Sequence, residues 1–273
     1  MTTARRPSSS DSDDSGGSQT VRRALALLRL AACGQERGVR LTDLVQMSGL
    51  NQPTVHRLLK TLVQEGAMTQ DPETRHYLIG PEVALLGLAR TRRFPLLTLA
   101  DPYLADLAEQ AGDTVFLSVR HGADSICIGR KTGRYPIQVL SIEVGVRRPL
   151  GIGVSGVALL SCLPRKDSDA LIRSNGRRLE VMGESPFELM RRVEAARAEG
   201  IAHAPHGLMP GTSAVAVPVR AAGGEPLAAV TITAMADRLN ARRLPQIVAL
   251  MRERAALIAR RHAEVEQTPA RPA

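Results

Sequence analysis

The chain has 273 residues, with 44% hydrophobic and only 2% aromatic side chains, no Trp, and a formal net charge of +9. This length allows two modest domains with buried cores, and the charge suits a polyanionic partner. The scarcity of aromatic side chains argues against RNA or single-stranded DNA as that partner, because proteins commonly hold unpaired bases by stacking them on aromatic rings.

Cysteine usage and hydropathy indicate the compartment. The three cysteines, Cys33, Cys127 and Cys162, are odd in number and widely spaced, so no disulfide framework is expected and a reducing environment fits. No apolar run approaches the roughly 18 residues of a membrane span, and the N-terminus lacks the apolar core of a signal peptide. We therefore expect a cytoplasmic protein with no membrane partner.

Both ends of the chain are predicted to be disordered tails. Residues 1–18 are rich in Ser, Asp and Gly and almost free of large apolar side chains, and residues 265–273 contain two prolines. Residues 21–32 form a strongly apolar segment with arginines on one side. We expect this segment to be a helix that packs under the following helices and completes a three-helix core.

Residues 41–66 organise the N-terminal domain, which is predicted to span residues 19–80. Thr42 is predicted as the N-cap of a short helix that Gly49 ends, because glycine tolerates the backbone angles of a tight turn. Asn51 is the expected N-cap of the next helix. That helix has one apolar stripe at helical spacing, formed by Val55, Leu58, Leu59, Leu62 and Val63.

The opposite face of this second helix is polar and basic. Two helices joined by a glycine turn form a helix-turn-helix, in which the stripe fixes the second helix and its first turns enter a major groove. The alternative is an ordinary helical hairpin with a solvated face. The residues predicted to contact double-stranded DNA are Thr42, Asn51, Gln52, Pro53, Thr54, His56, Arg57, Lys60 and Arg75.

Two short strands are predicted after the helix-turn-helix, at residues 68–70 and 76–79. The segment between them, residues 71–74, reads Asp-Pro-Glu-Thr, which is strong turn chemistry. The hairpin would form a wing that carries Arg75. The N-terminal domain is therefore expected to be a winged helix-turn-helix.

These motifs together resemble the IclR-type bacterial transcriptional regulators. The resemblance covers roughly residues 20–262 and runs through Ala24-Leu25, Leu41-Thr42, Ser48-Gly49-Leu50, residues 54–59, Leu62, Tyr77 and Gly80. It implies a DNA-binding regulator, repressor or activator, that responds to a small-molecule effector. It also implies a homodimer or homotetramer, with the linker helices at residues 81–111 contributing to the contact between subunits. These helices are predicted at residues 82–93 and 96–110, separated by Phe94-Pro95, with the domain boundary near residue 81.

The remaining residues, 112–264, are predicted to form an α+β domain built on a mostly antiparallel sheet. The resemblance implies that this is a GAF-like effector-binding domain. Strands are expected at residues 114–120, 125–131, 137–140, 144–150, 214–220 and 227–233, and helices at residues 154–163, 167–174, 186–199 and 241–262.

Three segments of this domain are predicted to line one effector pocket. Glycines at residues 151–156 leave backbone amides free beside a helix N-terminus, which favours an anion such as a carboxylate. Thr231 and Thr233 alternate along one strand and present two hydroxyls on one face. The alternative is that the glycines serve a tight turn and the threonines serve strand propensity. The resemblance assigns effector contact to Leu150, Val154, Ser155, Gly156, Thr212, Ala214, Thr231 and Thr233.

The chain departs from the family pattern at two places in this pocket. Residues 204–207 read Ala-Pro-His-Gly where many members carry acidic residues, and Val157 replaces a frequent lysine. Both departures weaken the transfer of any particular effector, although a small organic acid remains the expected class.

Enzymatic and metal-binding motifs are weak. Residues 153–157 are an imperfect match to a nucleophile elbow, because the second glycine comes one position early. His203 and His206 form an H-x-x-H pair in a Pro/Gly loop without further ligands. We therefore predict no catalytic residue, no metal and no cofactor. The remaining alternative is a metabolite-sensing module whose winged domain contacts a protein rather than DNA.

Overall fold

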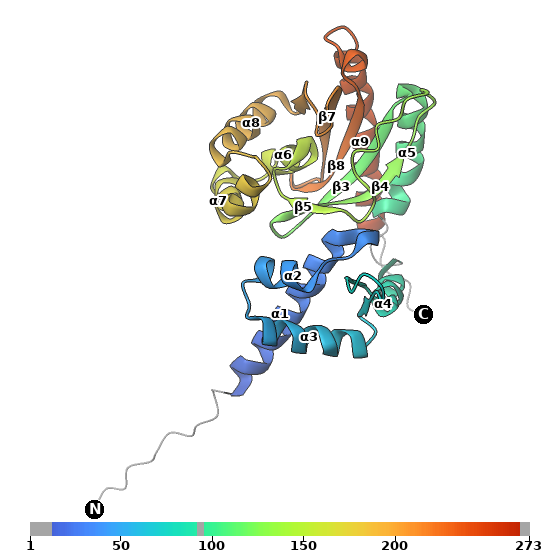
Figure 1. The fold of residues 1–273 in the computed structure, drawn as a ribbon. Coiled ribbons are helices and arrows are strands. Elements are labelled where there is room, and N and C mark those ends of the chain that lie inside the picture. The colour runs from blue at the N-terminus through green and yellow to red at the C-terminus, as the bar shows by residue number, and fades with distance from the viewer. Residues whose placement is uncertain (1–12, 92–95, 268–273) are drawn as a thin grey trace, which may run out of the picture. The chain divides into compact units, whose positions relative to one another are not determined.

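The computed structural model describes residues 13–91 and 96–267. The chain divides into two compact units, an N-terminal unit of Met1–Arg92 and a C-terminal unit of Arg93–Ala273. Figure 1 shows the helical N-terminal unit in blue to teal and the sheet-containing C-terminal unit in green to red. No helix within the described ranges is both long and apolar enough to cross a membrane.

The first helix, α1 (Asp13–Ala31), is longer than the sequence predicted. It begins inside the range assigned to the N-terminal tail, so residues 13–18 are helical and that part of the prediction is wrong. Adding residues to an existing helix costs little, because each one closes a further backbone hydrogen bond. At the other end, α9 (Leu244–Gln267) likewise extends into the predicted tail. The tail residues 1–12 and 268–273 lie outside the described residues.

The helix-turn-helix consists of α2 (Leu41–Ser48) and α3 (Gln52–Gln64), preceded by the 3-10 turn η1 (Ala32–Arg37). Arg40, not Thr42, is the N-cap of α2, because the chain leaves an extended segment there and turns helical at Leu41. Gly49 ends α2 in the left-handed conformation (φ 68°). Asn51 caps α3 as predicted, and its side-chain oxygen accepts the Thr54 N–H at 3.0 Å.

The core of the N-terminal unit unites these helices with the wing. The predicted stripe on α3 is turned inward, and Val55 and Leu59 are fully buried. The wing strands β1 (Met68–Gln70) and β2 (Tyr77–Ile79) pair antiparallel, and Val39 adds one bridge to Tyr77. The residues buried in this core are Leu27, Ala31, Val39, Leu44, Val55, Leu58, Leu59, Leu62, Met68 and Tyr77.

The two linker helices belong to different units. α4 (Pro81–Thr91) follows the wing, where the Glu82 N–H donates to the Gly66 carbonyl, and it lies in the N-terminal unit. α5 (Leu96–Ala111) buries Leu104 and Leu107 in the C-terminal unit. The boundary between compact units therefore falls after α4 rather than near residue 81. The predicted interruption at Phe94-Pro95 lies outside the described residues.

The C-terminal unit contains a six-stranded antiparallel sheet in the order β5-β4-β3-β8-β7-β6. The predicted strand at residues 137–140 is absent, and of residues 144–150 only the short β5 pairs, while the edge strand β6 was not predicted. The strands are β3 (Thr114–His121), β4 (Asp124–Lys131), β5 (Arg147–Pro149), β6 (Ala202–Ala204), β7 (Thr212–Arg220) and β8 (Pro226–Met235).

Helices cover both faces of this sheet. α5 and α9 lie on one face, and α6 (Gly153–Ser161), α7 (Arg165–Val181) and α8 (Pro186–Glu199) lie toward the other (Figure 1). The short turn η2 (Ala236–Leu239) joins β8 to α9. On β7 and β8, the residues facing α5 and α9 include Val215 and Ile232, whereas Ala214, Ala216 and Ala229 pack toward α6. These small side chains leave space between this part of the sheet and α6.

Candidate functional sites on an exposed helix and in a cavity

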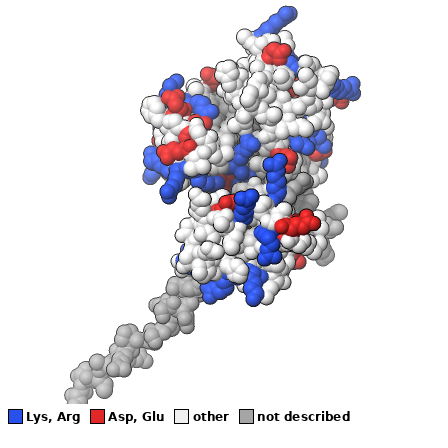
Figure 2. Space-filling model, viewed as in Figure 1, with Lys and Arg blue, Asp and Glu red and all other residues white. Residues whose placement is uncertain are grey.

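The polar face of α3 is open to solvent. Pro53, His56, Arg57 and Lys60 are exposed at helical spacing along one side, and Gln52 is exposed at the helix start. They lie opposite the buried stripe that fixes the helix to its core. Figure 2 shows Lys and Arg side chains on the part of the N-terminal unit that contains α3. The face thus presents donors and positive charge on a rigid support, as a major-groove reader requires.

The other residues predicted for this surface have more varied roles. Thr42 is exposed in the first turn of α2, and Arg75 is exposed on the wing. Asn51 uses its side-chain oxygen, and Thr54 its backbone N–H, to cap α3. Both residues therefore help to set the start of α3.

The wing turn is held by Asp71. Its Oδ1 accepts from the backbone N–H of Glu73 at 3.0 Å and of Thr74 at 2.7 Å, and from the Thr74 hydroxyl at 2.9 Å. These bonds, led by the Thr74 N–H, lower the pKa of Asp71 below its usual value because they favour the ionised carboxylate. Arg75 follows in the left-handed region (φ 61°), which turns the chain back into β2.

Arg40 was not predicted as part of this surface. It is exposed, and its Nε donates to His76 Nε2 at 3.2 Å. His76 Nδ1 lies 2.7 Å from the Arg37 carbonyl, which cannot donate, so Nδ1 carries the proton and Nε2 is free to accept from Arg40. Arg40 thus places a cation between the start of α2 and the wing, and its position before a helix N-terminus was the available sequence signal.

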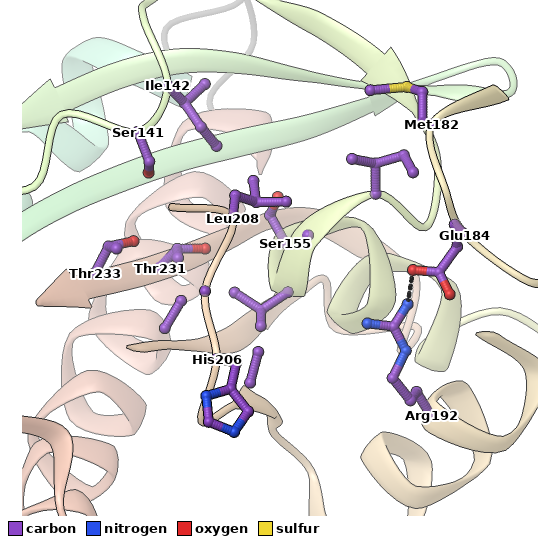
Figure 3. Close-up of a pocket in the computed structure, with 16 residues that line it drawn as sticks. Ser141, Ile142, Ser155, Met182, Glu184, Arg192, His206, Leu208, Thr231 and Thr233 are labelled. Atoms are coloured by element: carbon purple, nitrogen blue, oxygen red, sulfur yellow. Dashed lines mark hydrogen bonds and ion pairs between the residues drawn. The ribbon is translucent and has the colours of Figure 1, made fainter. Parts of the chain in front are cut away.

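A cavity of about 230 Å³ opens between the sheet and the helices α6 and α8. Of the eight residues predicted to contact the effector, five line it: Val154, Ser155, Ala214, Thr231 and Thr233. Ile152 and Gly153 also line it and belong to the glycine segment that was predicted to do so, and Ala204, His206 and Gly207 belong to the segment where the chain departs from the family pattern. The lining residues that were not predicted are Ser141, Ile142, Met182, Glu184, Arg192 and Leu208. Figure 3 shows ten of the lining residues by label.

The three remaining predicted residues support the cavity from behind. Leu150 is fully buried in the core shared by α6, α7 and α8. Gly156 allows close approach of two chain segments, because a Cβ there would lie 2.5 Å from the backbone nitrogen of Gly151. Thr212 donates its hydroxyl to the Met209 carbonyl at 2.6 Å. None of the three reaches the cavity wall.

The floor of the cavity carries two hydroxyls. Thr231 and Thr233 project from β8 toward α6, and each is at most 4% exposed. The Thr231 hydroxyl has no hydrogen-bond partner among the described residues. A buried hydroxyl without a partner is costly, so this atom marks a position where a ligand can supply the missing bond.

An ion pair lies on the other side of the cavity (Figure 3). Arg192 of α8 donates through Nη2 to Glu184, and their side chains are 39% and 19% exposed. Within the described ranges, His206 is the only other titratable residue that lines the cavity. The neighbouring His203 instead contacts Ser213 Oγ at 3.3 Å, and its pKa is lowered because burial disfavours the imidazolium.

The loop after β4 forms part of the cavity rim. Gln138, predicted to lie in a strand, accepts from the Thr114 hydroxyl at 2.8 Å and donates to the Gly112 carbonyl at 3.0 Å. Arg148 donates to the Ser141 carbonyl at 3.2 Å. These bonds hold the loop as a separate structure rather than as a strand and bring Ser141 to the cavity. Sequence alone offered no periodic signal for this arrangement.

Together these features define a class of protein. A winged helix-turn-helix whose second helix has an exposed basic face, joined to an α+β unit with a small cavity, is the architecture of a ligand-responsive transcriptional regulator.

Comparison with known proteins gives the family. The family model described as bacterial transcriptional regulator IclR C-terminal matches residues 89–260, and the IclR helix-turn-helix domain matches residues 20–72. The chain belongs to the IclR family of DNA-binding transcriptional regulators. The predicted winged helix-turn-helix, α+β class and family are thereby confirmed, and the alternative of a winged domain that contacts a protein finds no support.

Individual relatives agree with this assignment. The Glycerol operon regulatory protein of Streptomyces coelicolor is 30% identical over 89% of this chain and 95% of its own length. The crystal structure of a putative IclR regulator from Silicibacter sp. TM1040 has a TM-score of 0.74, 25% identity, and 89% and 95% coverage of the two chains. An IclR homolog from Microbacterium hydrocarbonoxydans, complexed with 4-hydroxybenzoate, shares the fold (TM-score 0.63, 19% identity, 90% and 99% coverage).

Proposed function

We propose that the chain binds a near-palindromic operator through α3 and the wing, and that a small organic acid in the cavity changes its operator affinity. The observation that carries the proposal is the combination of an exposed α3 face with a buried Thr231 hydroxyl in the other unit that has no hydrogen-bond partner in the described part of the chain. The C-terminal unit then acts as a GAF-like effector domain. Because linkage is reciprocal, operator and effector must change each other's affinity by the same factor.

Arg57 is the residue that we expect to matter most for operator affinity. It is exposed at the centre of the α3 face, so Arg57→Ala should weaken binding by about 10- to 100-fold, the loss of roughly 1–3 kcal/mol. The measurement is fluorescence anisotropy on a duplex that the wild-type protein selects from a random pool. Arg173→Ala is the matched control, because Arg173 is an exposed arginine on α7. Equal affinities for the wild type and Arg57→Ala would reject α3 as the reading helix.

The salt dependence of operator affinity tests whether the basic face of α3 contacts DNA phosphates. Binding that neutralises several phosphates should give a log–log slope of several units, on the order of −0.9 per contact. Lys60→Ala should make this slope shallower by about 0.9, the contribution of one phosphate contact. A slope near zero would contradict a DNA partner altogether.

The proposal that an effector binds in the cavity is tested by substitutions at the two threonines on its floor. The double substitution Thr231→Val and Thr233→Val removes both hydroxyls while nearly conserving volume, so it should abolish the effector response and leave operator binding intact. Organic acids that shift the melting temperature of the wild type supply the ligands, and a gel-shift titration measures the response. A variant that retains the full response would exclude the cavity as the effector site.

The chain is further proposed to act as a homodimer or homotetramer. α4 exposes three leucines, Leu85, Leu86 and Leu88, at 60%, 63% and 68%, and contiguous apolar surface of this kind usually has a partner. Dimerisation would place two recognition helices on half-sites about one DNA turn or a multiple apart. Light scattering after size exclusion should give a multiple of the chain mass, and Leu86→Lys should lower it.

The proposal requires no chemical step and no metal or cofactor. The effector should therefore be recovered unchanged after long incubation with the protein, which mass spectrometry can check. Because bacterial DNA lies in the cytoplasm, the proposed role places the protein there.

A further inference from the structure

A side-chain contact ties the start of α2 to the wing. Arg40, the residue before α2, donates its Nε–H to His76 Nε2 at 3.2 Å, and His76 is the residue before β2. His76 Nδ1 lies 2.7 Å from the Arg37 carbonyl oxygen, so Nδ1 carries the proton of the neutral ring. The neutral ring therefore donates to one chain segment and accepts from Arg40 with its other nitrogen.

This contact leaves most of the Arg40 guanidinium available. The group has five N–H donors in a planar fork, and the bond to His76 uses only the one on Nε. The residue is exposed, and no carboxylate whose position the structure describes pairs with it. A guanidinium that is held in place with both terminal nitrogens available suits a phosphate, which it can bind through two parallel hydrogen bonds.

The place of Arg40 in the helix-turn-helix also points to a phosphate. When the second helix of this motif enters the major groove, the first helix crosses the DNA backbone. α2 is that first helix, and Arg40 stands at its start, next to the wing. The first turn of α2 also contains the acidic Asp43, so a cation at this helix end offsets the repulsion between that carboxylate and a phosphate.

The bond between Arg40 and His76 depends on the charge of the imidazole ring. A proton on Nε2 would turn this acceptor into a donor that faces the Nε–H of Arg40, and it would place two positive charges in contact. The other charged residues around the ring are Arg37, whose carbonyl it contacts, Arg75, which precedes it, and Asp71, whose carboxylate senses its charge. Asp71 favours the imidazolium, but its Oδ1 is held by the wing turn, whereas the contact with Arg40 is direct.

We propose that Arg40 binds a DNA phosphate beside the major groove, and that His76 is its positioning residue, which holds the guanidinium only while the ring is neutral. The inference rests on the proposed function and adds to it a phosphate contact outside α3 and a dependence of that contact on pH. Protonation of His76 releases the Arg40 side chain from its fixed orientation. The contribution of Arg40 to DNA affinity therefore falls as the pH falls.

Arg40→Gln in the full-length protein tests the phosphate contact. Fluorescence anisotropy is measured on the selected operator duplex and on a scrambled duplex of the same length and composition. The variant should weaken both by a similar factor, about tenfold at low salt, because a phosphate contact carries no sequence information. Its log–log salt slope should be shallower by about 0.9 for each subunit bound. Arg173→Ala is the matched control, and Arg57→Ala should weaken the operator more than the scrambled duplex.

Two substitutions of His76 separate positioning from a purely structural role. The amide of glutamine reaches about as far as Nε2, so His76→Gln keeps an acceptor for Arg40 and does not titrate. Asparagine reaches only about as far as Nδ1, so His76→Asn keeps the donor to the Arg37 carbonyl and loses the acceptor for Arg40. At about pH 8, where the ring is mostly neutral, His76→Gln should retain most of the wild-type affinity. His76→Asn should be several-fold weaker, and it should cause no further loss when Arg40→Gln is already present.

The pH profile tests the dependence on ring charge. The affinity advantage of the wild type over Arg40→Gln should shrink several-fold from about pH 8 to about pH 5, the range in which histidines commonly change charge. In the His76→Gln background the same advantage should stay constant. Comparison of two proteins at each pH cancels the titration of His56, which is exposed on α3 in both.

Three outcomes overturn the inference. One is wild-type affinity of Arg40→Gln for both duplexes, or a loss on the operator alone, which would make Arg40 a base-reading residue. Another is an advantage of the wild type over Arg40→Gln that does not change with pH. The third is additive losses from Arg40→Gln and His76→Asn, because independent residues do not act through one another. Each of these outcomes leaves operator binding by the wild type intact, whereas failure of the proposed function would abolish it.

Discussion

The exposed face of α3 and the cavity of the C-terminal unit are built in opposite ways. The side chains of the α3 face all come from one helix, Gln52–Gln64. They project into solvent, and the apolar residues on the opposite side of the helix are buried. The cavity walls come from separate segments between residues 141 and 233, and most of the lining residues are buried or partly buried. Substitutions on the α3 face should therefore change binding without changing stability, whereas substitutions around the cavity should often change both.

The largest expected effect on stability is at an ion-pair cluster of the C-terminal unit whose members are far apart in the sequence. The buried carboxylate of Asp113 pairs with Arg238 Nε at 2.7 Å and with Arg243 Nη1 at 2.8 Å, both far away in the sequence. Asp113→Ala would leave two partly buried guanidinium groups without their partner, so it should destabilise this unit by about 3–5 kcal/mol. Chemical denaturation followed by circular dichroism measures the loss.

Asp106→Ala is the control for that prediction. Asp106 also pairs with an arginine, Arg254, at 2.5 Å, but its side chain is 46% exposed. Its removal should cost less than about 1 kcal/mol, because exposed ion pairs contribute little. Equal losses for the two variants would show that burial does not decide the contribution of these pairs.

A core substitution in the N-terminal unit, whose contacts are more local in the sequence, tests the stability of that unit in the same way. Leu59 is fully buried under α3, and Leu59→Ala should destabilise this unit by about 3 kcal/mol, through lost apolar burial and the cavity left behind. Lys60→Ala, at the next position on the exposed face, should be nearly neutral. Hydrogen exchange resolves the two units, and protection should fall in residues 13–91 only. A comparable loss in the C-terminal unit would contradict the division into separate compact units.

The same contrast explains what sequence could predict. The α3 face follows from helical periodicity within a few turns, so Gln52, Arg57 and Lys60 were identified from the chain alone and are exposed as expected. Thr42 was misplaced as a cap, because the start of α2 is set by the bridge between Val39 and Tyr77, a tertiary contact.

In the C-terminal unit, sequence identified the elements better than the cavity. The residues found, such as Thr231 and Ser155, lie on regular strands or at a helix start, where alternation and glycine patterns are informative. The residues missed, such as Ser141, Glu184 and Arg192, come together only after the chain folds. Gln138 shows the reason, since its side chain anchors a loop that apolar composition alone predicted to be a strand.

A smaller effect on stability is expected at the cavity floor, where removal of a hydroxyl should stabilise the protein rather than destabilise it. Thr231→Val replaces a buried hydroxyl, which has no partner among the residues that the structure describes, with a methyl group of similar size. Without ligand it should therefore stabilise the C-terminal unit by up to about 1 kcal/mol. Thr114→Val is the contrasting control, because the Thr114 hydroxyl donates to Gln138 and its removal should destabilise. Destabilisation by Thr231→Val would imply that the hydroxyl has a partner in the folded protein.

The smallest effect concerns pH at the wing turn, where an exposed carboxylate organises the hairpin beside α3. The pKa of Asp71 is lowered from its ordinary value of 3.8, chiefly by the Thr74 N–H, so the folded turn prefers the ionised form. A group with a depressed folded pKa contributes stability above the unfolded pKa and loses it as pH falls through the folded value. The Thr74 amide resonance should therefore titrate with a midpoint below 3.8, and Asp71→Asn should abolish this titration. Because the group is exposed, overall stability should hardly change over the same pH range, whereas order in the turn should fall.

A midpoint at or above 3.8 would mean that the turn does not depend on the Asp71 carboxylate, and the wing would then owe its shape to strand pairing alone.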